Sequence, residues 1–321
     1  MKILIVRFSS IGDIVLTTPV VRCVKQQLNE VEVHYVTKQK FKNVIEHNPY
    51  LDKIYTFQHS INEIITDLRG EQYDYIIDLH HNLRSLKLKW QLKAKSFSFN
   101  KLNWEKFLKV QFKQDVLPSV HIVDRYLDTV KAWDVKNDGK GLDYFISLHD
   151  ELNLAEVLPS HFLNGYQALV VGGSYYTKKI PLQKLKEICE KSTLPLVLLG
   201  GKEDAAVANE LHHLFKEKTF NACGLFSLNQ SASLVKQAHY VITSDTGLMH
   251  IAAAYKKNII SLWGNTIPEF GMSAYLPGPQ SQILEVKNLR CRPCSKLGYK
   301  QCPKKHFKCM NEIDIANLKL E

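Results

Sequence analysis

The sequence predicts two doubly wound α/β domains, and three observations carry this prediction. With 321 residues the chain exceeds the ~250–300 residues at which a single hydrophobic core usually stops growing. A hydrophobic content of 45% with 23% charged residues is typical of a soluble globular protein. Short apolar runs alternate with helical patterns in both halves of the chain, which is the pattern of parallel sheets.

The elements follow from this alternation. In the first half, strands are expected at 2–8, 31–37, 53–57 and 73–79, and helices at 12–28, 41–49 and 61–70. In the second half, strands are expected at 167–173, 195–201, 240–245 and 259–264, and helices at 181–192, 203–215, 227–237 and 247–255. The polar stretch 149–166 between the halves is the predicted linker. We therefore expect an N-terminal domain at 1–155, a C-terminal domain at 156–309 and a C-terminal helix at 310–321.

The N-terminus predicts a cytoplasmic protein. The stretch MKILIVRFSSIGD has one Lys and a short apolar run that enters a turn, so it is typical of a first strand rather than a signal peptide. No apolar run approaches the ~20 residues that span a bilayer.

A net charge of +10 favours a polyanionic partner, and the charge is concentrated in residues 84–113. This stretch carries nine basic residues and one acidic residue, interleaved with six Trp or Phe. A solvated face of amphipathic helices is one interpretation. A membrane-facing or phosphate-binding patch is the other, because basic and aromatic residues together suit an anionic interface. Nucleic acid is less favoured, since no nucleic-acid-binding signature accompanies the patch.

Polar residues follow the predicted strands, at the sheet edge where ligands of such folds bind. After the first strand, Ser10, Gly12 and Asp13 open a helix. Asp13 is either a cap or a general base, and Gly12 would permit close approach of a substrate.

The second half repeats this arrangement three times. Thr177 and Lys178 follow one strand and suit a phosphate, although a solvated lysine pair is the alternative. Glu203 and Asp204 start a helix, where they can cap it or bind ribose hydroxyls. Asp245, Thr246, Gly247 and Leu248 form a turn whose N–H groups can point at a pyrophosphate, and His250 follows, packed or in contact with phosphate. The usual dinucleotide and P-loop fingerprints are absent from the sequence.

Four of the seven cysteines lie close together in the sequence, as Cys291, Cys294, Cys302 and Cys309. In a cytosolic chain the C-x2-C start favours a thiolate metal site, with zinc the natural ion. Reduced free thiols are the alternative, and His306 is a possible substitute ligand. The other three cysteines are expected in the core.

Taken together, several segments resemble glycosyltransferase family 9, the lipopolysaccharide heptosyltransferases. They are KILIVRFSSIGDIVLTTPV, YIIDLHHNLRS, HIVDRYL, GGSYYTKKIP, LGGKED, SDTGLMHIAAA and SLWGNTIPEFG. The resemblance covers nearly the whole chain in order. It implies the GT-B architecture, in which two Rossmann-like domains face a central cleft, with acceptor in the N-terminal domain and nucleotide sugar in the C-terminal one.

The resemblance also implies roles. Asp13 matches the proposed catalytic base, and Lys178 matches a lysine on the donor phosphates. Asp245, Thr246, Gly247, Leu248 and His250 match the signature that holds the ADP diphosphate, and Glu203 or Asp204 matches a ribose-binding carboxylate. Arg84 and the basic tract after it occupy the region used for a phosphorylated acceptor.

The predicted function is inverting transfer of heptose from ADP-heptose to a phosphorylated, lipid A-linked inner-core acceptor. No metal is expected to be required for catalysis, because Lys and helix N–H groups can neutralise the leaving diphosphate. The enzyme is expected at the cytoplasmic face of the inner membrane, as a peripheral protein. Transfer of another sugar by the same mechanism is the first alternative, and a basic nucleic-acid-binding protein is the second.

Overall fold

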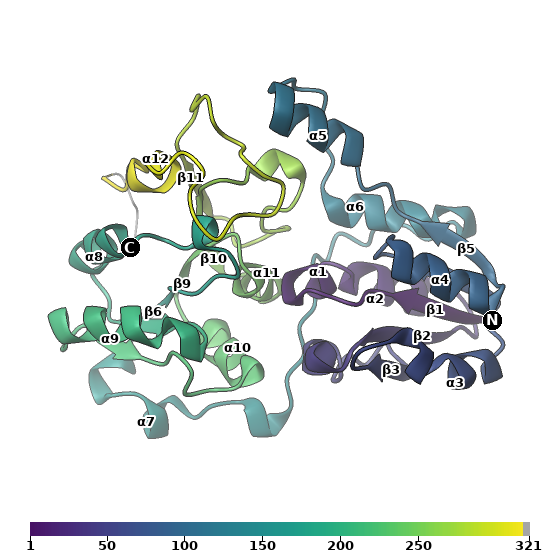
Figure 1. The fold of residues 1–321 in the computed structure, drawn as a ribbon. Coiled ribbons are helices and arrows are strands. Elements are labelled where there is room, and N and C mark those ends of the chain that lie inside the picture. Colours follow the sequence, from purple (N-terminus) through teal and green to yellow (C-terminus); the bar gives the residue numbers. More distant parts are fainter. Residues whose placement is uncertain (317–321) are drawn as a thin grey trace. The chain divides into compact units, whose positions relative to one another are not determined.

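A computed structural model describes residues 1–316 and contains two compact α/β units (Figure 1). Unit 1 comprises residues 1–101 and 120–145, and unit 2 comprises residues 102–119 and 146–321. The second unit begins again at residue 146, about ten residues before the expected boundary at 155/156. The segment 102–119, which interrupts unit 1 in the sequence, also belongs to unit 2. This segment belongs to unit 2 because of its contacts: Lys113 donates to the carbonyl of Pro293, and Lys106 lies over the ring of Phe270, and both partners are in unit 2.

Unit 1 is built on a five-stranded parallel sheet with strand order β3-β2-β1-β4-β5. Its strands are β1 Lys2–Val6, β2 Glu32–Lys38, β3 Lys53–Phe57, β4 Tyr75–Asp78 and β5 Lys95–Ser98. Its α-helices are α1 Ile11–Val15, α2 Thr18–Gln27, α3 Ile65–Gly70, α4 Leu83–Leu92 and α6 Ile122–Leu127.

Two expected helices of unit 1 differ in the structure. The helix expected at 12–28 is divided into α1 and α2, because Pro19 in the first turn of α2 cannot donate the hydrogen bond that would join them. The helix expected at 41–49 is a 3-10 helix over Gln39–Val44.

The core of unit 1 fills both faces of this sheet. On one face, alternate residues such as Leu4 and Val6 pack against Leu68 of α3 and Leu88 of α4. Helices α2 and α6 contact each other, and α2 also contacts β2. Four of the five residues of β1 are fully buried, as expected for the central strand of a parallel sheet covered on two sides.

Unit 2 is built on a six-stranded parallel sheet with strand order β11-β10-β9-β6-β7-β8. Its strands are β6 Gln167–Val170, β7 Leu196–Leu199, β8 Thr219–Asn221, β9 Tyr240–Ser244, β10 Asn258–Trp263 and β11 Gln282–Glu285. Its α-helices are α5 Asn103–Phe112, α7 Leu154–Val157, α8 Leu182–Lys191, α9 Ala205–Leu214, α10 Leu228–Gln237, α11 Gly247–Ala254 and α12 Lys308–Asn311.

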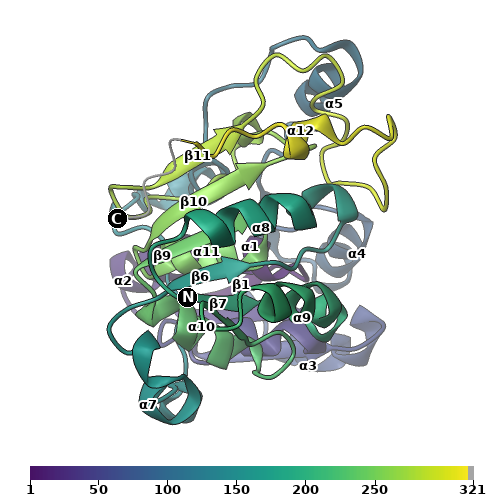
Figure 2. The same ribbon diagram turned by 90° about the vertical axis from the view of Figure 1, so that its left-hand side faces the viewer.

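Helices cover both faces of this sheet. Apolar residues of α8, α9 and α12 share one core cluster with the strands. Helices α10 and α11 contact each other, and Figure 2 shows them behind the sheet with α8 and α9 in front. Of the helix expected at 310–321, the structure has only the end of the four-residue α12, and residues 317–321 lie outside the described residues.

Candidate functional site

The strand orders place the predicted site residues at the two positions where such sheets bind ligands. In each sheet the chain reverses its direction of winding between two central strands, β1 and β4 in unit 1, β6 and β9 in unit 2. Ligands of doubly wound folds bind beyond the carboxyl ends of these strands. Asp13 follows β1 and Arg84 follows β4, while Lys178 follows β6 and Asp245 follows β9.

Asp13 lies in the first turn of α1 and is held from two sides. One carboxylate oxygen lies 2.7 Å from Nη2 of Arg7. The other accepts hydrogen bonds from the hydroxyl of Ser10, at 2.7 Å, and from its backbone N–H, at 3.1 Å. The side chain of Asp13 is 21% exposed, so it is fixed in orientation and still accessible. Ser10 thus orients Asp13, and the neighbouring Gly12 is buried.

Arg7 is a site residue that the sequence reasoning missed. Its guanidinium is buried and donates to the carbonyls of Ser9, at 2.7 Å, and Leu79, at 2.6 Å, and to the hydroxyl of Tyr126, at 3.0 Å. A buried charge needs such partners, so Arg7 is anchored to three parts of unit 1. The signal was a single Arg inside the otherwise apolar run ILIVRF.

His80 lies near this pair and was also missed. Its ring packs against Phe8, with the centroids 4.8 Å apart. Burial, helped by the positive charge of Arg7, lowers the pKa of His80 to about 4, so the ring is neutral at pH 7. The turn that carries His80 is fixed by buried Asp78, which accepts from the N–H groups of His80 and His81.

Arg84 lies exposed in the first turn of α4. It is close enough to Lys38, at the end of β2, to interact with it electrostatically. Burial, together with the positive charges of Arg84 and Lys40, lowers the pKa of Lys38. These three cations gather at the carboxyl edge of the sheet, where their mutual repulsion would be relieved by a bound anion.

In unit 2, Lys178 and Asp245 form an ion pair across the switch point. The Lys178 ammonium lies 2.6 Å from the Asp245 carboxylate, and the two side chains are 17% and 12% exposed. The same carboxylate oxygen accepts from the hydroxyl of Thr266, at 3.1 Å. Thr177 beside Lys178 is buried and exchanges hydrogen bonds with the backbone of Tyr299, so it supports the loop.

The N-terminus of α11 lies beside this pair. Thr246 is its N-cap residue, and among the described residues no side chain caps the helix. The first turn, with Gly247 and Leu248, therefore presents backbone N–H groups that an anion can occupy. His250 is only 2% exposed, which favours a packed position over direct contact with a ligand.

Asn265, in unit 2, is a third site residue that the sequence reasoning missed. It follows β10 and is 1% exposed, and in the part of the chain that the structure describes neither atom of its amide has a hydrogen-bond partner. The hydroxyl of buried Ser244, directly before Asp245, has none either within residues 1–316. Buried polar groups are almost always hydrogen-bonded, so the amide of Asn265 and the hydroxyl of Ser244 are positions where water or a polar group of a ligand would bind. The signal was the polar NT after the apolar strand IISLWG.

The two candidate ribose-binding carboxylates differ in their surroundings. Asp204 is 4% exposed, lies 2.5 Å from the ammonium of Lys179 and accepts from the N–H of Gly201, at 3.0 Å. Glu203 is exposed. Asp204 therefore holds the loops together, and Glu203 has the accessible carboxylate.

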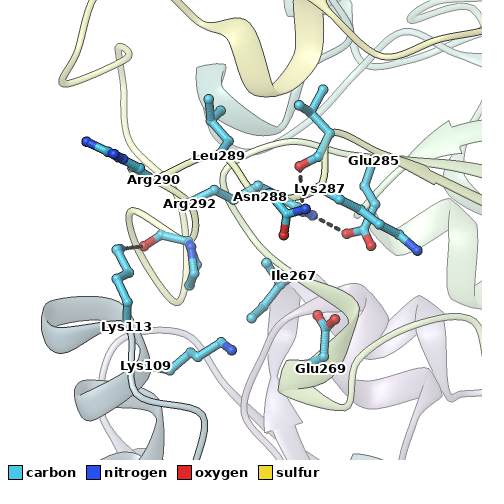
Figure 3. A pocket seen from close by; sticks show the side chains of 12 residues that line it. Lys109, Lys113, Ile267, Glu269, Glu285, Lys287, Asn288, Leu289, Arg290 and Arg292 are labelled. Atoms are coloured by element: carbon cyan, nitrogen blue, oxygen red, sulfur yellow. Dashed lines mark hydrogen bonds and ion pairs between the residues drawn. The ribbon is translucent and has the colours of Figure 1, made fainter.

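A polar pocket of about 530 Å³ lies in unit 2 between α5 and the segment after β11 (Figure 3). Five basic side chains and two acidic ones line it: Lys109, Lys113, Lys287, Arg290 and Arg292, with Glu269 and Glu285. Arg292 is paired with Glu285, at 2.6 Å. Within residues 1–316, Lys287 and Arg290 have no such partner, so the pocket offers them to an anion.

Two parts of the chain carry groups of potential metal ligands. In residues 1–316, the one group whose three ligand atoms all lie within 4.8 Å is Glu32, His34 and Glu71. The ammonium groups of Lys2 and Lys53 each lie 2.6 Å from Glu71, so cations of the protein already neutralise this group. Cys291, Cys294, Cys302 and Cys309 all lie in the segment after β11 and all have free thiols.

No helix within residues 1–316 combines the length and the apolar character needed to cross a bilayer.

Comparisons with known proteins place the chain in a family. The sequence profile of glycosyltransferase family 9 (heptosyltransferase) matches residues 61–306. Lipopolysaccharide heptosyltransferase 1 of Campylobacter coli is 24% identical over 290 residues, which cover 83% of this chain and 84% of that protein.

Two solved structures share the fold. E. coli ADP-heptose lipopolysaccharide heptosyltransferase II superposes with a TM-score of 0.73 at 16% identity, covering 97% of this chain and 98% of that one. An E. coli heptosyltransferase with ADP superposes with a TM-score of 0.66 at 21% identity, covering 88% and 92%. The two parallel-sheet units are therefore the Rossmann-like domains of the GT-B fold, and the chain belongs to glycosyltransferase family 9, the heptosyltransferases of lipopolysaccharide biosynthesis.

Proposed function

We propose that this glycosyltransferase transfers heptose from ADP-heptose to a phosphorylated, lipid A-linked inner-core acceptor, with inversion at the anomeric carbon. The observation that carries the proposal is the Lys178–Asp245 pair beside the uncapped N-terminus of α11. A cation and a row of backbone N–H groups at a switch point suit a diphosphate.

The donor would bind at this point of unit 2. The Lys178 ammonium and the N–H groups of Gly247 and Leu248 would contact the diphosphate, with Thr246 adding its hydroxyl. Glu203 is the better candidate for binding the ribose hydroxyls, because Asp204 already forms an ion pair with Lys179. That one relative was solved with ADP and again with ADP-2-deoxy-2-fluoro heptose supports adenine as the base.

Asp13 would be the catalytic base. As the acceptor hydroxyl attacks the anomeric carbon, its proton passes to the Asp13 carboxylate and the bond to the diphosphate breaks. A positioned general base contributes typically ~10²–10⁴-fold in rate. Arg7 and Ser10 hold the carboxylate in one orientation, while Lys178 and the α11 N–H groups stabilise the charge on the leaving diphosphate, so no divalent ion is needed at this step.

A phosphorylated acceptor has two candidate anion sites. One is the cluster of Arg84, Lys38 and Lys40 at the edge of the unit 1 sheet. The other is the pocket of Figure 3, where Lys287 and Arg290 are available.

The side chains of helix α5 support peripheral association of the enzyme with the cytoplasmic face of the inner membrane. Trp104, Phe107 and Phe112 are 67%, 45% and 62% exposed, and the first two rings stack with their centroids 5.6 Å apart. Lysines follow on the same short helix, at Lys106 and Lys109. Exposed aromatic rings flanked by lysines suit the headgroup region of an anionic bilayer.

The decisive test of the mechanism is Asp13→Asn, which keeps the shape of the side chain and removes the proton acceptor. Turnover should fall by about 10²–10⁴-fold, while the Kd for ADP stays unchanged because the donor residues lie in unit 2. Asp67→Asn, at an exposed position of α3, is the matched control and should behave as wild type. Turnover of Asp13→Asn near the wild-type rate would remove Asp13 as the base.

The donor is tested by calorimetry with ADP, UDP and GDP. The proposal expects ADP to bind most tightly, and Lys178→Met to weaken all three. Tighter binding of UDP or GDP would show that another nucleotide sugar is the donor. Product mass after incubation with ADP-heptose and a deacylated core acceptor then identifies the sugar transferred.

Membrane association is tested by sedimentation with vesicles of anionic or zwitterionic phospholipid. Binding to anionic vesicles should weaken with added salt. It should also be weaker for the double variant that carries Trp104→Ala and Phe107→Ala. Replacing exposed Leu148 of unit 2 by Ala controls for the loss of any exposed apolar side chain. Equal binding of all three proteins would exclude α5 as the contact.

A further inference from the structure

The pocket of Figure 3 lies wholly within unit 2 and is walled by two parts of the chain that are far apart in the sequence. One wall is α5 with Lys113 directly after it, and the other is residues 285–293, from the end of β11 onward. The Lys113 ammonium joins the walls, because it donates to the carbonyl of Val110, at 2.8 Å, and to that of Pro293, at 2.6 Å. A volume of about 530 Å³ lies within the ~300–1,000 Å³ of small-molecule sites, so the pocket has room for more than an inorganic ion.

Two of the charged residues of the pocket, Arg292 and Glu285, already satisfy each other. Nη2 of Arg292 lies 2.6 Å from the Glu285 carboxylate, and the two side chains are only 7% and 12% exposed. Arg292 also donates to the carbonyls of Gly264, at 2.6 Å, and Thr266, at 2.9 Å. This ion pair is therefore a fixed and electrically neutral part of the wall, and the charge that a ligand meets comes from the other side chains.

The other charged side chains around the pocket are mostly cations. They are Lys109, Lys113, Lys287 and Arg290, with Glu269 as the one carboxylate besides Glu285 among the described lining residues. Lys109 lies 3.0 Å from Asp115, but that carboxylate is 69% exposed, and exposed ion pairs contribute little. Lys287 and Arg290 are exposed and, within residues 1–316, have no ion-pair partner. An anion would therefore meet positive charge here without breaking a strong internal pair.

The arrangement of these groups indicates the class of ligand. Figure 3 shows Arg290 and Lys287 at opposite ends of the pocket, with the two lysines of the other wall on the α5 side. Cations spread in this way suit a ligand with a charged group and an extended polar body better than a single small ion. The carboxylate of Glu269 and the amide of Asn288 also line the pocket and can form hydrogen bonds with hydroxyl groups. Anionic groups together with hydroxyl groups are the chemistry of a phosphorylated saccharide.

The pocket shares a segment with the donor site. Residues 264–270 follow β10, and in this segment the hydroxyl of Thr266 donates to Asp245, at 3.1 Å. The next residue, Ile267, lines the pocket. Arg292 holds the same segment through two of its carbonyls. A ligand in the pocket and a nucleotide at the donor site would therefore lie on two sides of one short segment, and what orders this segment for one ligand orders it for the other.

Helix α5 forms its wall without being anchored in a core. None of its ten residues is buried. The ammonium of Lys106 lies 5.8 Å from the centroid of the Phe270 ring, and Asn103 accepts a hydrogen bond from Lys296, at 3.3 Å. Segments with few buried contacts open at a low cost in free energy. A ligand that bridges the two walls would restrict this motion, and a second ligand would then bind to a chain that is already ordered.

We propose that this pocket binds a phosphorylated saccharide between α5 and residues 285–293, and that this ligand and the nucleotide at the donor site each strengthen the binding of the other through residues 264–270. That the saccharide is the phosphorylated acceptor rests on the proposed function. It assigns the anionic part of the acceptor to unit 2, the same unit that would bind the donor. Binding of the saccharide itself does not depend on the transfer reaction.

The first experiment measures the Kd for glucose 6-phosphate by calorimetry at constant ionic strength, with glucose and inorganic phosphate as reference ligands. Glucose 6-phosphate should bind about tenfold or more tightly than either, because it alone carries both the charge and the hydroxyl groups. Equally tight binding of inorganic phosphate would overturn the assignment of a saccharide. Equally tight binding of glucose would overturn the role of the cations.

The cations are tested with the double variant that carries Lys287→Gln and Arg290→Gln. Its Kd for glucose 6-phosphate should rise about tenfold or more, because hydrogen bonds to charged groups are lost. The matched control carries Lys131→Gln and Lys216→Gln, also at exposed positions, so it lowers the net charge equally and should bind as the wild type does. An unchanged Kd in the first variant, or an equal rise in both variants, would overturn the site.

Hydrogen exchange of the wild-type chain tests the site without any substitution. Saturating glucose 6-phosphate should slow the exchange of the backbone amides of α5 and leave those of α9 unchanged, because only α5 forms a wall of the pocket. Unchanged exchange in α5, or equal slowing in both helices, would overturn the bridging of the two walls.

The coupling is measured as the Kd for ADP with and without saturating glucose 6-phosphate, or for UDP or GDP if one of these binds more tightly. The Kd should fall about fivefold or more, and by linkage the nucleotide should lower the Kd for glucose 6-phosphate by the same factor. An unchanged Kd would overturn the coupling, and a higher Kd would show that the sugar phosphate occupies the donor site instead of the pocket. Failure of the proposed function would appear as absence of sugar transfer and would leave the binding of glucose 6-phosphate and the protection of α5 unaffected.

Discussion

The burial of His80 has a consequence for stability that can be calculated. Its pKa of about 4 in the folded chain compares with about 6.5 for an exposed histidine. The unfolded chain therefore binds the extra proton, and stability rises with pH between these two values. The contribution of neutral His80 is complete above pH 6.5 and is lost as the pH falls toward 4. The full loss is about 3 kcal/mol, and about 2 kcal/mol of it is gone at pH 5.

The perturbation that tests this reasoning is His80→Gln, which keeps a polar side chain and removes the titration. Hydrogen exchange of the β1 amides reports the free energy of unfolding of unit 1 separately from unit 2. Between pH 7.5 and pH 5.0 the wild type should lose about 2 kcal/mol more than the variant. NMR of the thirteen histidines should also show one signal, absent in His80→Gln, that titrates near pH 4. Equal losses in the two proteins, or titration of that signal near pH 6.5, would refute the burial argument.

Three further predictions follow from charged and strained positions. Arg22→Met should lower the free energy of unfolding of unit 1 by about 3 kcal/mol or more in urea denaturation, because buried Arg22 neutralises both Asp138 and Asp143. A loss smaller than that caused by replacing an exposed Arg with Met would contradict this prediction. Glu71 has a pKa lowered by hydrogen bonds from Lys2, so the extra stability that Glu71→Gln removes should be fully present above pH 4.5 and should decrease as the pH falls below 4.5; the difference in urea midpoint between wild type and Glu71→Gln should therefore be smaller at pH 3 than at pH 7. Gly298→Ala places a Cβ 2.7 Å from that of Tyr175 at a φ of +134°, so the KM for the donor should rise with little change in kcat, and an unaltered KM would argue against an effect on the loop that carries Tyr175 and Lys178.

The central strands and the residues that follow them were predictable, while the edges were not. The buried strands β1, β6, β9 and β10 are continuous apolar runs, and their periodicity was sufficient to find them. Strands β5, β8 and β11 were missed because they are short and only partly buried edge strands, whose sequences KSFS, TFN and QILE carry little apolar signal.

Residues that act through tertiary contacts were beyond the sequence. Arg7 and Asn265 each stand inside or beside an apolar run, and periodicity gives no reason to single them out. Their significance comes from burial: Arg7 holds Asp13, and Asn265 has an unpaired amide in the part of the chain that the structure describes. Lys178 and Asp245 were each predicted, but their pairing depends on β6 and β9 being neighbours, which only the strand order establishes.

The two carboxylates at the switch points are each held by a cation, and the difference between the cations separates their roles. Arg7 is bonded to three further groups of unit 1, so it cannot leave Asp13 without stranding buried hydrogen-bond donors. Asp13 is thereby fixed in place, which its proposed role as a base requires. Lys178 lies on a short 3-10 turn and pairs with one carboxylate, that of Asp245. Asp245 also accepts a hydrogen bond from the hydroxyl of Thr266. In the proposed donor complex, Lys178 would therefore turn from Asp245 to the diphosphate while the carboxylate stays hydrogen-bonded, and Asp245 would occupy the place of the donor's charge when no donor is bound.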